Sequence, residues 1–412
     1  MTECAFPLSP RDAALKLAHE PGLAWLDGGL EHGQDGRFSF VSATPCETVT
    51  GGWQSLPAGD LAYDGPLRAS DVPQWVGYVA YDSASTPALC FARYDAFYAF
   101  DHQGERGYLV GDDAEACERL AIKLQRAPVA DLAFEAGEVT ATPWSDHEAA
   151  IRGALASIRE GEVYEINLAR HFRAPFVGSS LGLFLRMREE SPVPLGLYFD
   201  AGDHALLGRS MERFLRYRDG VLSTSPIKGT LARRGDERAE AQALTDDPKE
   251  RAEHAMVVDL MRNDLSRVCE IGSVRIDELM AVLPFAGLSH LVSTISGRTQ
   301  ATVAEILAQT FPPGSVTGAP KVRVLRAIAE LESFSRGAYC GCYGFLDRAG
   351  GCSFAVTIRS AVVRDAHVDY YAGGGIVADS DPERECDETE LKARMFLRAL
   401  HPETEQVPRE KR

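Results

Sequence analysis

Residues 145–172 read SDHEAAIRGALASIREGEVYEINLARHF, and this stretch predicts a helix that leads directly into a strand. Ser145 or Asp146 can cap the N-terminus of the helix, and Gly161 can end it. After Gly161 the side chains alternate in the way that is typical of a half-buried strand. Patterning is clearer from Trp144 onward than before it, so this unit marks the start of the best-defined part of the chain.

Elements on both sides of this unit form runs of one kind instead of a regular strand–helix alternation. Strand-like segments are expected at residues 37–45, 74–82, 94–100, 107–111, 221–225 and 352–365, and helices at residues 114–125, 249–268, 321–332 and 387–400. Strict alternation would predict a parallel sheet. The grouping instead predicts antiparallel sheets with helices packed outside them.

The chain divides by its patterning into four parts. Residues 1–125 mix short strand-like runs with turns, and residues 126–143 carry turn-forming proline and glycine that favour a linker with room for one strand. Residues 144–400 form the strongly patterned region, and residues 401–412 form a polar tail. At 412 residues the chain is long enough for two to three domains or for one large α/β fold.

Composition excludes several classes of protein. Hydrophobic residues make up 45% and charged residues 25%, which excludes a disordered, collagen-like or coiled-coil chain. The net charge of −17 argues against non-specific binding to nucleic acid or to an anionic membrane. The N-terminus has no apolar signal-peptide core, and no apolar run approaches a membrane span. The nine scattered cysteines favour free thiols, so we expect a cytoplasmic protein.

Two glutamates continue the apolar faces of their predicted helices. Glu253 precedes Met256, Val257 and Leu260, and Glu388 precedes Leu391 and Met395, in each case at helical spacing. The simpler interpretation of either glutamate is that it ends an apolar stripe and reaches solvent. Together they suggest a shared hard cation such as Mg²⁺, which prefers oxygen ligands. No cluster of histidine and cysteine offers a zinc site instead.

Several cationic and glycine-rich segments are candidates for an anion site. Lys392 shares a helix face with Glu388, either as a routine ion pair or as a ligand for a substrate carboxylate. Arg359 lies in an apolar strand, either at an edge or facing inward to bind a carboxylate. The run Gly373, Gly374 and Gly375 follows a strand and lets a ligand approach the backbone. Residues 311–321 lack the ending of a phosphate loop.

Taken together, the sequence resembles the chorismate-utilising enzymes, a family that includes the anthranilate, aminodeoxychorismate, isochorismate and salicylate synthases. The matching stretches are PIKGT at 226–230, ERAEHAMVVDLMRNDLSRVCEIGSV at 250–274, LSHLVSTISG at 288–297, FPPGSVTGAPK at 311–321, RGAYCGCYGF at 336–345, TIRSAVV at 357–363 and AGGGIVADSDPERECDETELKAR at 372–394. GRFSFVSATP and WVGYVAYD in the N-terminal third also resemble the family's N-terminal region. The resemblance implies an α/β sandwich in which two antiparallel sheets pack inside flanking helices.

The resemblance also implies roles for individual residues. Lys228 within PIKGT points to the aminodeoxychorismate synthase subgroup, because anthranilate synthases resemble PIAGT. In that subgroup the lysine attacks C2 of chorismate and ammonia then enters at C4. Attack needs a neutral amine, and we expect burial near Mg²⁺ and substrate to lower the pKa of Lys228. Glu212 matches the general acid, and Glu253 and Glu388 match Mg²⁺ ligands. The residues that match substrate contacts are Gly229, Thr230, His290, Thr317, Tyr339, Arg359, Gly373, Gly374, Gly375 and Lys392.

Alternatives remain for some of these residues and for the function. His290 lies between apolar neighbours and can be a buried core histidine, and Glu212 can be a surface residue beside Arg213. Where the family often has YQ-x-N, this chain has Tyr164-Glu165-Ile166-Asn167, and the role of Glu165 stays open. No glutaminase site is recognised, so ammonia is expected from a separate glutamine amidotransferase subunit. The rival functions are an anthranilate synthase-like enzyme and a non-catalytic chorismate or tryptophan sensor.

Overall fold

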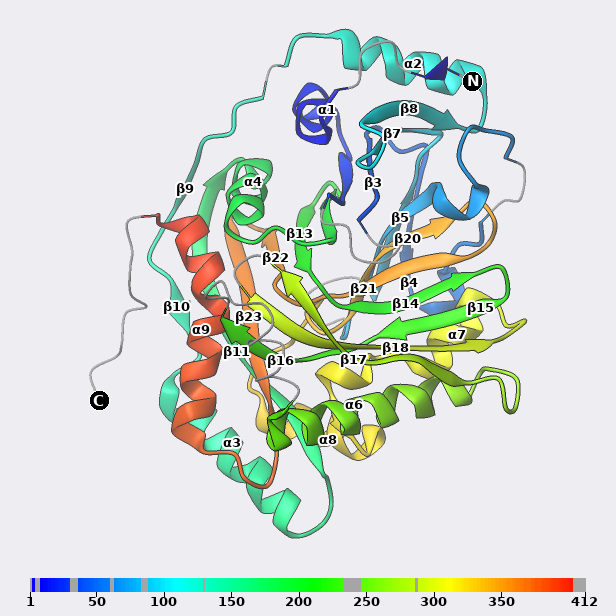
Figure 1. The fold of residues 1–412 in the computed structure, drawn as a ribbon. Helices are drawn as coiled ribbons and strands as arrows, with labels where there is room; N and C mark the ends of the chain where they lie inside the picture. The colour runs from blue at the N-terminus through cyan, green and yellow to red at the C-terminus, as the bar shows by residue number, and fades with distance from the viewer. Residues whose placement is uncertain are drawn as a thin grey trace.

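A computed structural model describes residues 2–3, 8–29, 36–59, 63–82, 88–128, 130–232, 246–285 and 288–402. Within these residues two sheets form the centre of the molecule and helices lie around them (Figure 1). Every strand pairing described in either sheet is antiparallel. The structure therefore confirms the predicted fold class, a sandwich of two antiparallel sheets with helices outside.

The larger sheet has the strand order β1-β8-β7-β3-β2-β12-β13-β22-β23-β11-β10, and β9 and β19 also pair with β11. Its strands are β1 (Thr2–Glu3), β2 (Ala24–Asp27), β3 (Phe38–Ser42), β7 (Ala96–Asp101), β8 (Arg106–Gly111), β9 (Phe134–Ala136), β10 (Thr140–Ala141), β11 (Glu165–Gly178), β12 (Leu195–Asp200), β13 (His204–Ser210), β19 (Gly318–Ala319), β22 (Ala361–Arg364) and β23 (His367–Ile376). Strand β11 and its partner β23 form the longest ladder of this sheet.

The smaller sheet has the order β16-β18-β15-β14-β21-β20-β5-β6-β4, with β17 also on β18. Its strands are β4 (Glu47–Gly51), β5 (Pro73–Val79), β6 (Leu89–Arg93), β14 (Arg213–Arg218), β15 (Val221–Ser225), β16 (Ile227–Ala232), β17 (Arg275–Phe285), β18 (Leu288–Arg298), β20 (Cys342–Asp347) and β21 (Cys352–Val356). Strand β16, which carries the PIKGT segment, lies at one end of this order.

Apolar side chains from both sheets meet between them and hold the sandwich together. Phe40 and Phe199 of the larger sheet pack with Val76, Tyr78 and Tyr343 of the smaller one, and all five are buried. Burying a side chain of this size contributes about 1.5–3 kcal/mol. The two inner faces therefore behave as one core.

Helices cover the outer faces of the two sheets. They are α1 (Pro10–Leu17), α2 (Ala114–Gln125), α3 (Trp144–Arg159), α4 (Ser180–Glu190), α6 (Pro248–Ser266), α7 (Val303–Thr310), α8 (Lys321–Leu331) and α9 (Pro382–Leu400). Helices α1, α2, α4 and α9 pack on the larger sheet, and α6 and α7 pack on the smaller one. Helices α3 and α8 pack together near the start of β11.

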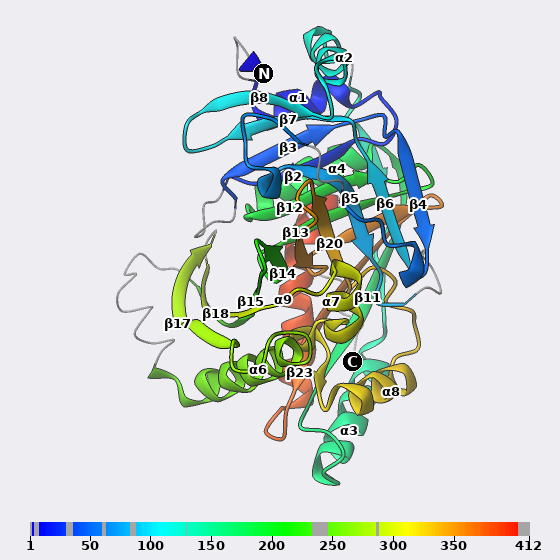
Figure 2. The ribbon, with the colours of Figure 1, turned by 90° about the vertical axis from the view of Figure 1, so that its right-hand side faces the viewer.

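The N-terminal third contributes strands to both sheets. Strand β2 pairs with β12, and β5 pairs with β20, so residues 1–125 are built into the same sandwich as the later region. Figure 2 shows β3, β7 and β8 beneath α1 and α2 at one end of the molecule. The predicted linker contains two short strands, β9 and β10, that pair with β11.

Several sequence predictions differ from the structure. The strand predicted at 352–365 is two strands, because the chain leaves the smaller sheet after β21 and enters the larger one at β22. The last helix begins at Pro382 instead of 387, because Asp381 caps it and Pro382 suits the first helical position. The glycine run lies inside β23 and does not follow it. Helix α3 begins at Trp144 with Pro143, and neither Ser145 nor Asp146, at its N-cap.

The structure also bears on the absence of membrane spans and on the state of the cysteines. None of the helices in the described part of the chain is long and apolar enough to cross a membrane. The cysteines at 46, 90, 117, 269, 340, 342, 352 and 386 are free thiols, and Cys4 lies outside the described residues.

Candidate active site

A cavity of about 710 Å³ lies where the end of the smaller sheet meets β23 of the larger one. Helix α6 supplies Glu250 and Glu253 to its wall, and α9 supplies side chains from Arg384 to Lys392. Small-molecule sites usually occupy about 300–1,000 Å³. The volume therefore suits a small organic substrate, and the wall is rich in both carboxylates and cations.

Lys228 of β16 reaches this cavity and is held by a buried carboxylate. Its Nζ donates a hydrogen bond of 2.9 Å to Oε1 of Glu165, the first residue of β11. The side chains are 16% and 5% exposed, so the ion pair is largely shielded from water. Burial opposes the charge of Lys228, but Glu165, Glu253 and Glu212 outweigh it and raise the pKa of the lysine. The pKa of Lys228 is therefore raised in the protein without ligands, and the lowering expected beside Mg²⁺ and substrate stays a prediction.

Glu212 faces the same cavity from the turn between β13 and β14. It is 4% exposed, so it is not a surface residue. Burial raises the pKa of Glu212 to about 7, against smaller opposing effects of Ser315, Lys228 and the backbone at Ile227. A carboxyl group with this pKa is partly protonated at neutral pH and can donate a proton. The neighbouring Arg213 lines a different cavity.

Glu253 and Glu388 come to the same cavity from α6 and α9. Val257 is buried on the side of α6 that carries Glu253, as the stripe predicted. The stripe predicted for Glu388 is wrong, because Leu391 is 56% exposed and the buried face of α9 lies elsewhere. Glu388 pairs with Lys392 at 2.6 Å, and its side chain is 45% exposed. The α9 side of the cavity is therefore open to solvent.

The glycine run brings the backbone of β23 close to these groups. A Cβ atom at Gly375 would lie 2.4 Å from Oε1 of Glu165 and 3.1 Å from Nζ of Lys228. At Gly374 it would lie 3.3 Å from a carboxylate oxygen of Glu385. Real Cβ atoms do not approach other atoms to 2.4 Å, so a side chain at position 375 would push the carboxylate of Glu165 away from its present position.

Arg359 occupies the crossing between β21 and β22 and lines the cavity. Its backbone has φ of +52°, a conformation that residues other than glycine rarely adopt. One guanidinium nitrogen donates a hydrogen bond of 3.2 Å to the carbonyl oxygen of Lys392. Lys392 in turn donates a hydrogen bond of 2.8 Å to the carbonyl oxygen of Gly373. Two cations are thus fixed on the α9 side of the cavity.

The remaining predicted substrate contacts divide into two groups. His290 and Tyr339 line the cavity and are both buried. Thr317 is not part of the cavity wall, because its hydroxyl donates to the carbonyl oxygens of Pro313 and Gly314. Its own carbonyl oxygen accepts from the backbone N–H of Asn167.

The PIKGT segment is described only in part. Gly229 and Thr230 continue the backbone of β16 opposite β18, and Thr230 pairs with His290 in that ladder. The side chain of Thr230 lies outside what the structure describes.

Some residues of the cavity wall were not predicted from the sequence. Asn167, Ser315, Tyr371 and Glu385 all line it. Asn167 belongs to the Tyr164–Asn167 segment whose role stayed open, and Glu385 lies one helical turn before Glu388. Tyr371 stacks on Tyr339 with ring centroids 5.3 Å apart. Asn167, Ser315 and Glu385 lie in stretches already singled out from the sequence, so a search around known candidates could have found them.

No group of three His, Cys, Asp or Glu side chains in the described residues forms a ready-made metal site. Mg²⁺ commonly takes only one or two protein carboxylates and completes its shell with water and substrate anions. Glu253 and Glu388 supply two carboxylates to one cavity. The donor set therefore fits Mg²⁺ bound together with an anionic substrate, and it does not fit zinc.

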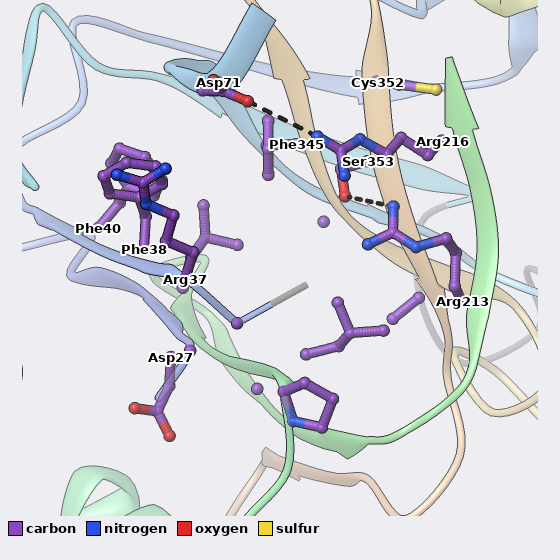
Figure 3. Close-up of a pocket in the computed structure, with 18 of the residues that line it drawn as sticks. Asp27, Arg37, Phe38, Phe40, Asp71, Arg213, Arg216, Phe345, Cys352 and Ser353 are labelled. Carbon is purple, nitrogen blue, oxygen red and sulfur yellow. Dashed lines mark hydrogen bonds and ion pairs between the residues drawn. The ribbon is translucent and has the colours of Figure 1, made fainter. Parts of the chain in front are cut away.

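A second, smaller cavity lies between the N-terminal strands and β14, and it shares no lining residue with the first. Figure 3 shows Arg213 and Arg216 of β14 side by side, with Phe38 and Phe40 across the cavity. Arg216 pairs with Asp71, and burial lowers the pKa of Arg213 to about 9. None of the predicted site residues lies in this cavity.

Comparisons with known proteins agree on one family. Residues 36–398 match the sequence model of a family described as chorismate binding enzyme. Aminodeoxychorismate synthase component 1 of Klebsiella aerogenes is 39% identical over 327 residues, which cover 76% of this chain and 71% of that protein. Anthranilate synthase component 1 of Thermus thermophilus is 34% identical, with 95% of each chain covered. The crystal structure of anthranilate synthase component I from Streptococcus pneumoniae superposes with a TM-score of 0.76, 26% identity, and coverage of 96% of this chain and 99% of that one.

Proposed function

This chain belongs to the chorismate binding enzyme family, and we propose that it is the chorismate-converting component of an aminodeoxychorismate synthase. The reaction would join chorismate and ammonia into 4-amino-4-deoxychorismate, a precursor of p-aminobenzoate and folate. Relatives named aminodeoxychorismate synthase component 1 at 34% to 39% identity support this choice. An amino-group transfer to chorismate is thus the reaction class.

The observation that carries the proposal is the position of Lys228. Its Nζ lies in a cavity that also holds Glu212, Glu253 and Glu388. A lysine amine attacking C2 of chorismate would block ammonia there and direct it to C4. Covalent attack divides one difficult displacement into two easier ones. A chain that lacked this lysine would leave C2 open to ammonia.

Glu212 would protonate the C4 hydroxyl as it leaves. Its buried position and its pKa of about 7 give it a proton to donate near neutral pH. Arg359 and Lys392 would bind the substrate carboxylates on the α9 side of the cavity. Glu253 and Glu388 would hold Mg²⁺, and the bound metal would neutralise and orient a substrate carboxylate. The buried side chains of His290 and Tyr339 would shape the wall beside the ring.

Ammonia would come from a separate glutamine amidotransferase subunit or from ammonium in solution. The relatives' names contain "component 1", which supports a second component.

An anthranilate synthase-like activity is the second candidate. It is favoured by the Thermus thermophilus relative, which covers 95% of this chain. The two activities differ in product, because an anthranilate synthase releases pyruvate and aminates C2. A chorismate or tryptophan sensor is a third candidate, but it would need neither the acid Glu212 nor the amine Lys228.

The test is incubation of the purified chain with chorismate, Mg²⁺ and ammonium, followed by mass analysis of the product and an assay for pyruvate. We expect 4-amino-4-deoxychorismate without pyruvate. Anthranilate with an equal amount of pyruvate would establish the second candidate. Binding of chorismate with no turnover would establish a sensor.

A further inference from the structure

Glu165 makes a contact that the reaction outlined above does not use. Its Oε1 accepts the 2.9 Å hydrogen bond from Nζ of Lys228, and its side chain is almost wholly buried. Gly375 and Lys228 both line the cavity and both lie against this carboxylate, whereas Glu165 itself is not part of the cavity wall. Glu165 can therefore contact Nζ from outside the cavity wall, on the side away from the substrate ring.

Lys228 needs such a partner if it is to act as a nucleophile. An ammonium group has no lone pair, so Nζ must lose a proton before it can attack carbon. The groups that face Lys228 are Glu165 from β11, Glu212 from the turn after β13, and Glu253 and His254 from α6. The three carboxylates keep the lysine charged, and burial and the charge of Lys228 lower the pKa of His254 to about 4.

Among these groups Glu165 is the best placed to take the proton. Within the described residues, Nζ donates its hydrogen bond to Glu165. Glu212 must keep its own proton to release the C4 hydroxyl, and Glu253 is committed to the metal. Glu165 carries a carboxylate and can take a proton, which an amide at the same position could not do.

We propose that Glu165 is the proton acceptor for Lys228 and returns the proton when the lysine departs. In the first step the N–H bond of the ammonium breaks, an O–H bond forms on Glu165, and neutral Lys228 results. The lone pair of Nζ then bonds to C2, and the C4–O bond breaks as the hydroxyl takes the proton of Glu212. Ammonia bonds to C4, the C2–N bond breaks, and Nζ leaves as a neutral amine.

The final transfers restore the starting state and balance the reaction. The new C4 ammonium gives a proton to Glu212, and Glu165 gives its proton back to Lys228, so chorismate and ammonia yield product and water. Substrate entry favours the first step, because excluding water from a buried ion pair penalises charge and favours the neutral pair. This inference rests on the proposed function, since it requires Lys228 to attack chorismate.

The test measures how fast an adduct forms on Lys228 after chorismate and Mg²⁺ are added without ammonia. Samples are stopped by quenched flow and analysed by intact-protein mass spectrometry, at a series of pH values on both sides of neutrality. Glu165→Gln should slow this rate at neutral pH by roughly a hundredfold, which is typical for loss of a general base. The rate should then rise about tenfold per pH unit as solvent takes over deprotonation. Asp264→Asn is the matched control. Asp264 also accepts a 2.6 Å hydrogen bond from a buried lysine, Lys321, but neither residue lines the cavity. This control should keep the wild-type rate.

If Glu165 acted only through its charge, Glu165→Gln would change the rate of adduct formation in the opposite direction. Removing its charge would lower the pKa of Lys228 and leave more neutral amine, so Glu165→Gln would form the adduct as fast as wild type or faster at neutral pH. That result would overturn the inference and leave the proposed function intact. Absence of any adduct in the wild-type protein would overturn both. Thermal unfolding of each variant shows that a slow rate does not reflect lost structure.

Discussion

Replacing Glu212 with glutamine should abolish most activity and at the same time stabilise the fold above neutral pH. The two effects have one cause, the burial that raises the pKa of this carboxyl from 4.5 to about 7. Each pKa unit corresponds to about 1.4 kcal/mol, so the ionised form costs the folded state about 3 kcal/mol. A glutamine side chain at this position would carry no charge and would avoid this cost, but it would have no proton to donate.

The sign of the pH dependence follows from linkage. Because the pKa is higher in the folded state than in the unfolded state, the folded protein holds a proton that the unfolded chain has lost between about pH 4.5 and 7. Stability from this group therefore falls as pH rises through that window and is constant above it. The difference in unfolding free energy between Glu212→Gln and wild type should grow from near zero at the lower end of this window to about 3 kcal/mol above its upper end.

Two assays check this pair of effects. Denaturant unfolding across and above this pH window measures stability, with Glu148→Gln as a control because its side chain is 39% exposed in an ion pair with Arg152 and does not line the cavity. The pH profile of kcat/KM for chorismate, measured at a constant concentration of uncharged ammonia, reports the pKa values of catalytic groups in the free enzyme. A general acid with this pKa predicts a tenfold fall per pH unit above about pH 7. A variant that is active at the wild-type rate, or that is no more stable than wild type above this window, would refute the reasoning.

Three further predictions follow from the same cavity. Glu253→Gln or Glu388→Gln should reduce activity by about a hundredfold and weaken the dependence of activity on Mg²⁺ in a metal titration. The circular dichroism spectrum should stay unchanged. An unaltered titration in both variants would show that these residues do not bind the metal. Gly375→Ala should lower activity by at least roughly tenfold, because its Cβ would displace Glu165 and Lys228, and a wild-type rate would show that this contact is not needed. Ammonium should support turnover alone, and glutamine should do so only when an amidotransferase subunit is added; glutamine-driven product from the purified chain would contradict this.

The sequence predicts the longer helices well, because they depend on local periodicity, whereas the sandwich was implied by the family resemblance and helices α1, α4 and α7 were not predicted. Helix α2 has the bounds that its pattern predicts, and α6 and α8 begin and end within two residues of theirs. A change of sheet leaves no such signal, so the pattern at 352–365 predicts one strand where the structure has two. Arg359 consequently lies in the left-handed conformation of a crossing, not on the face of a strand.

The site could be predicted only as a set of residues and not as a set of contacts. Glu253 and Glu388 were paired first because each continues an apolar helix face and then through the family resemblance, and both line one cavity. The bond between Lys228 and Glu165 joins strands of different sheets, and strand order is not encoded in local pattern. For the same reason the sequence contained no sign that the carboxylate of Glu165 raises the pKa of Lys228 in the protein without ligands.

The central claim is that Lys228 carries the substrate and that ammonia enters at C4, and the covalent intermediate tests it most directly. Wild-type protein is mixed with chorismate and Mg²⁺ without ammonia, freed of chorismate by gel filtration, and then given isotopically labelled ammonium. The account predicts an adduct on the peptide that contains Lys228, its loss on addition of ammonium, and 4-amino-4-deoxychorismate with the nitrogen label at C4. A label at C2, or product formed at the wild-type rate by Lys228→Ala, would contradict it.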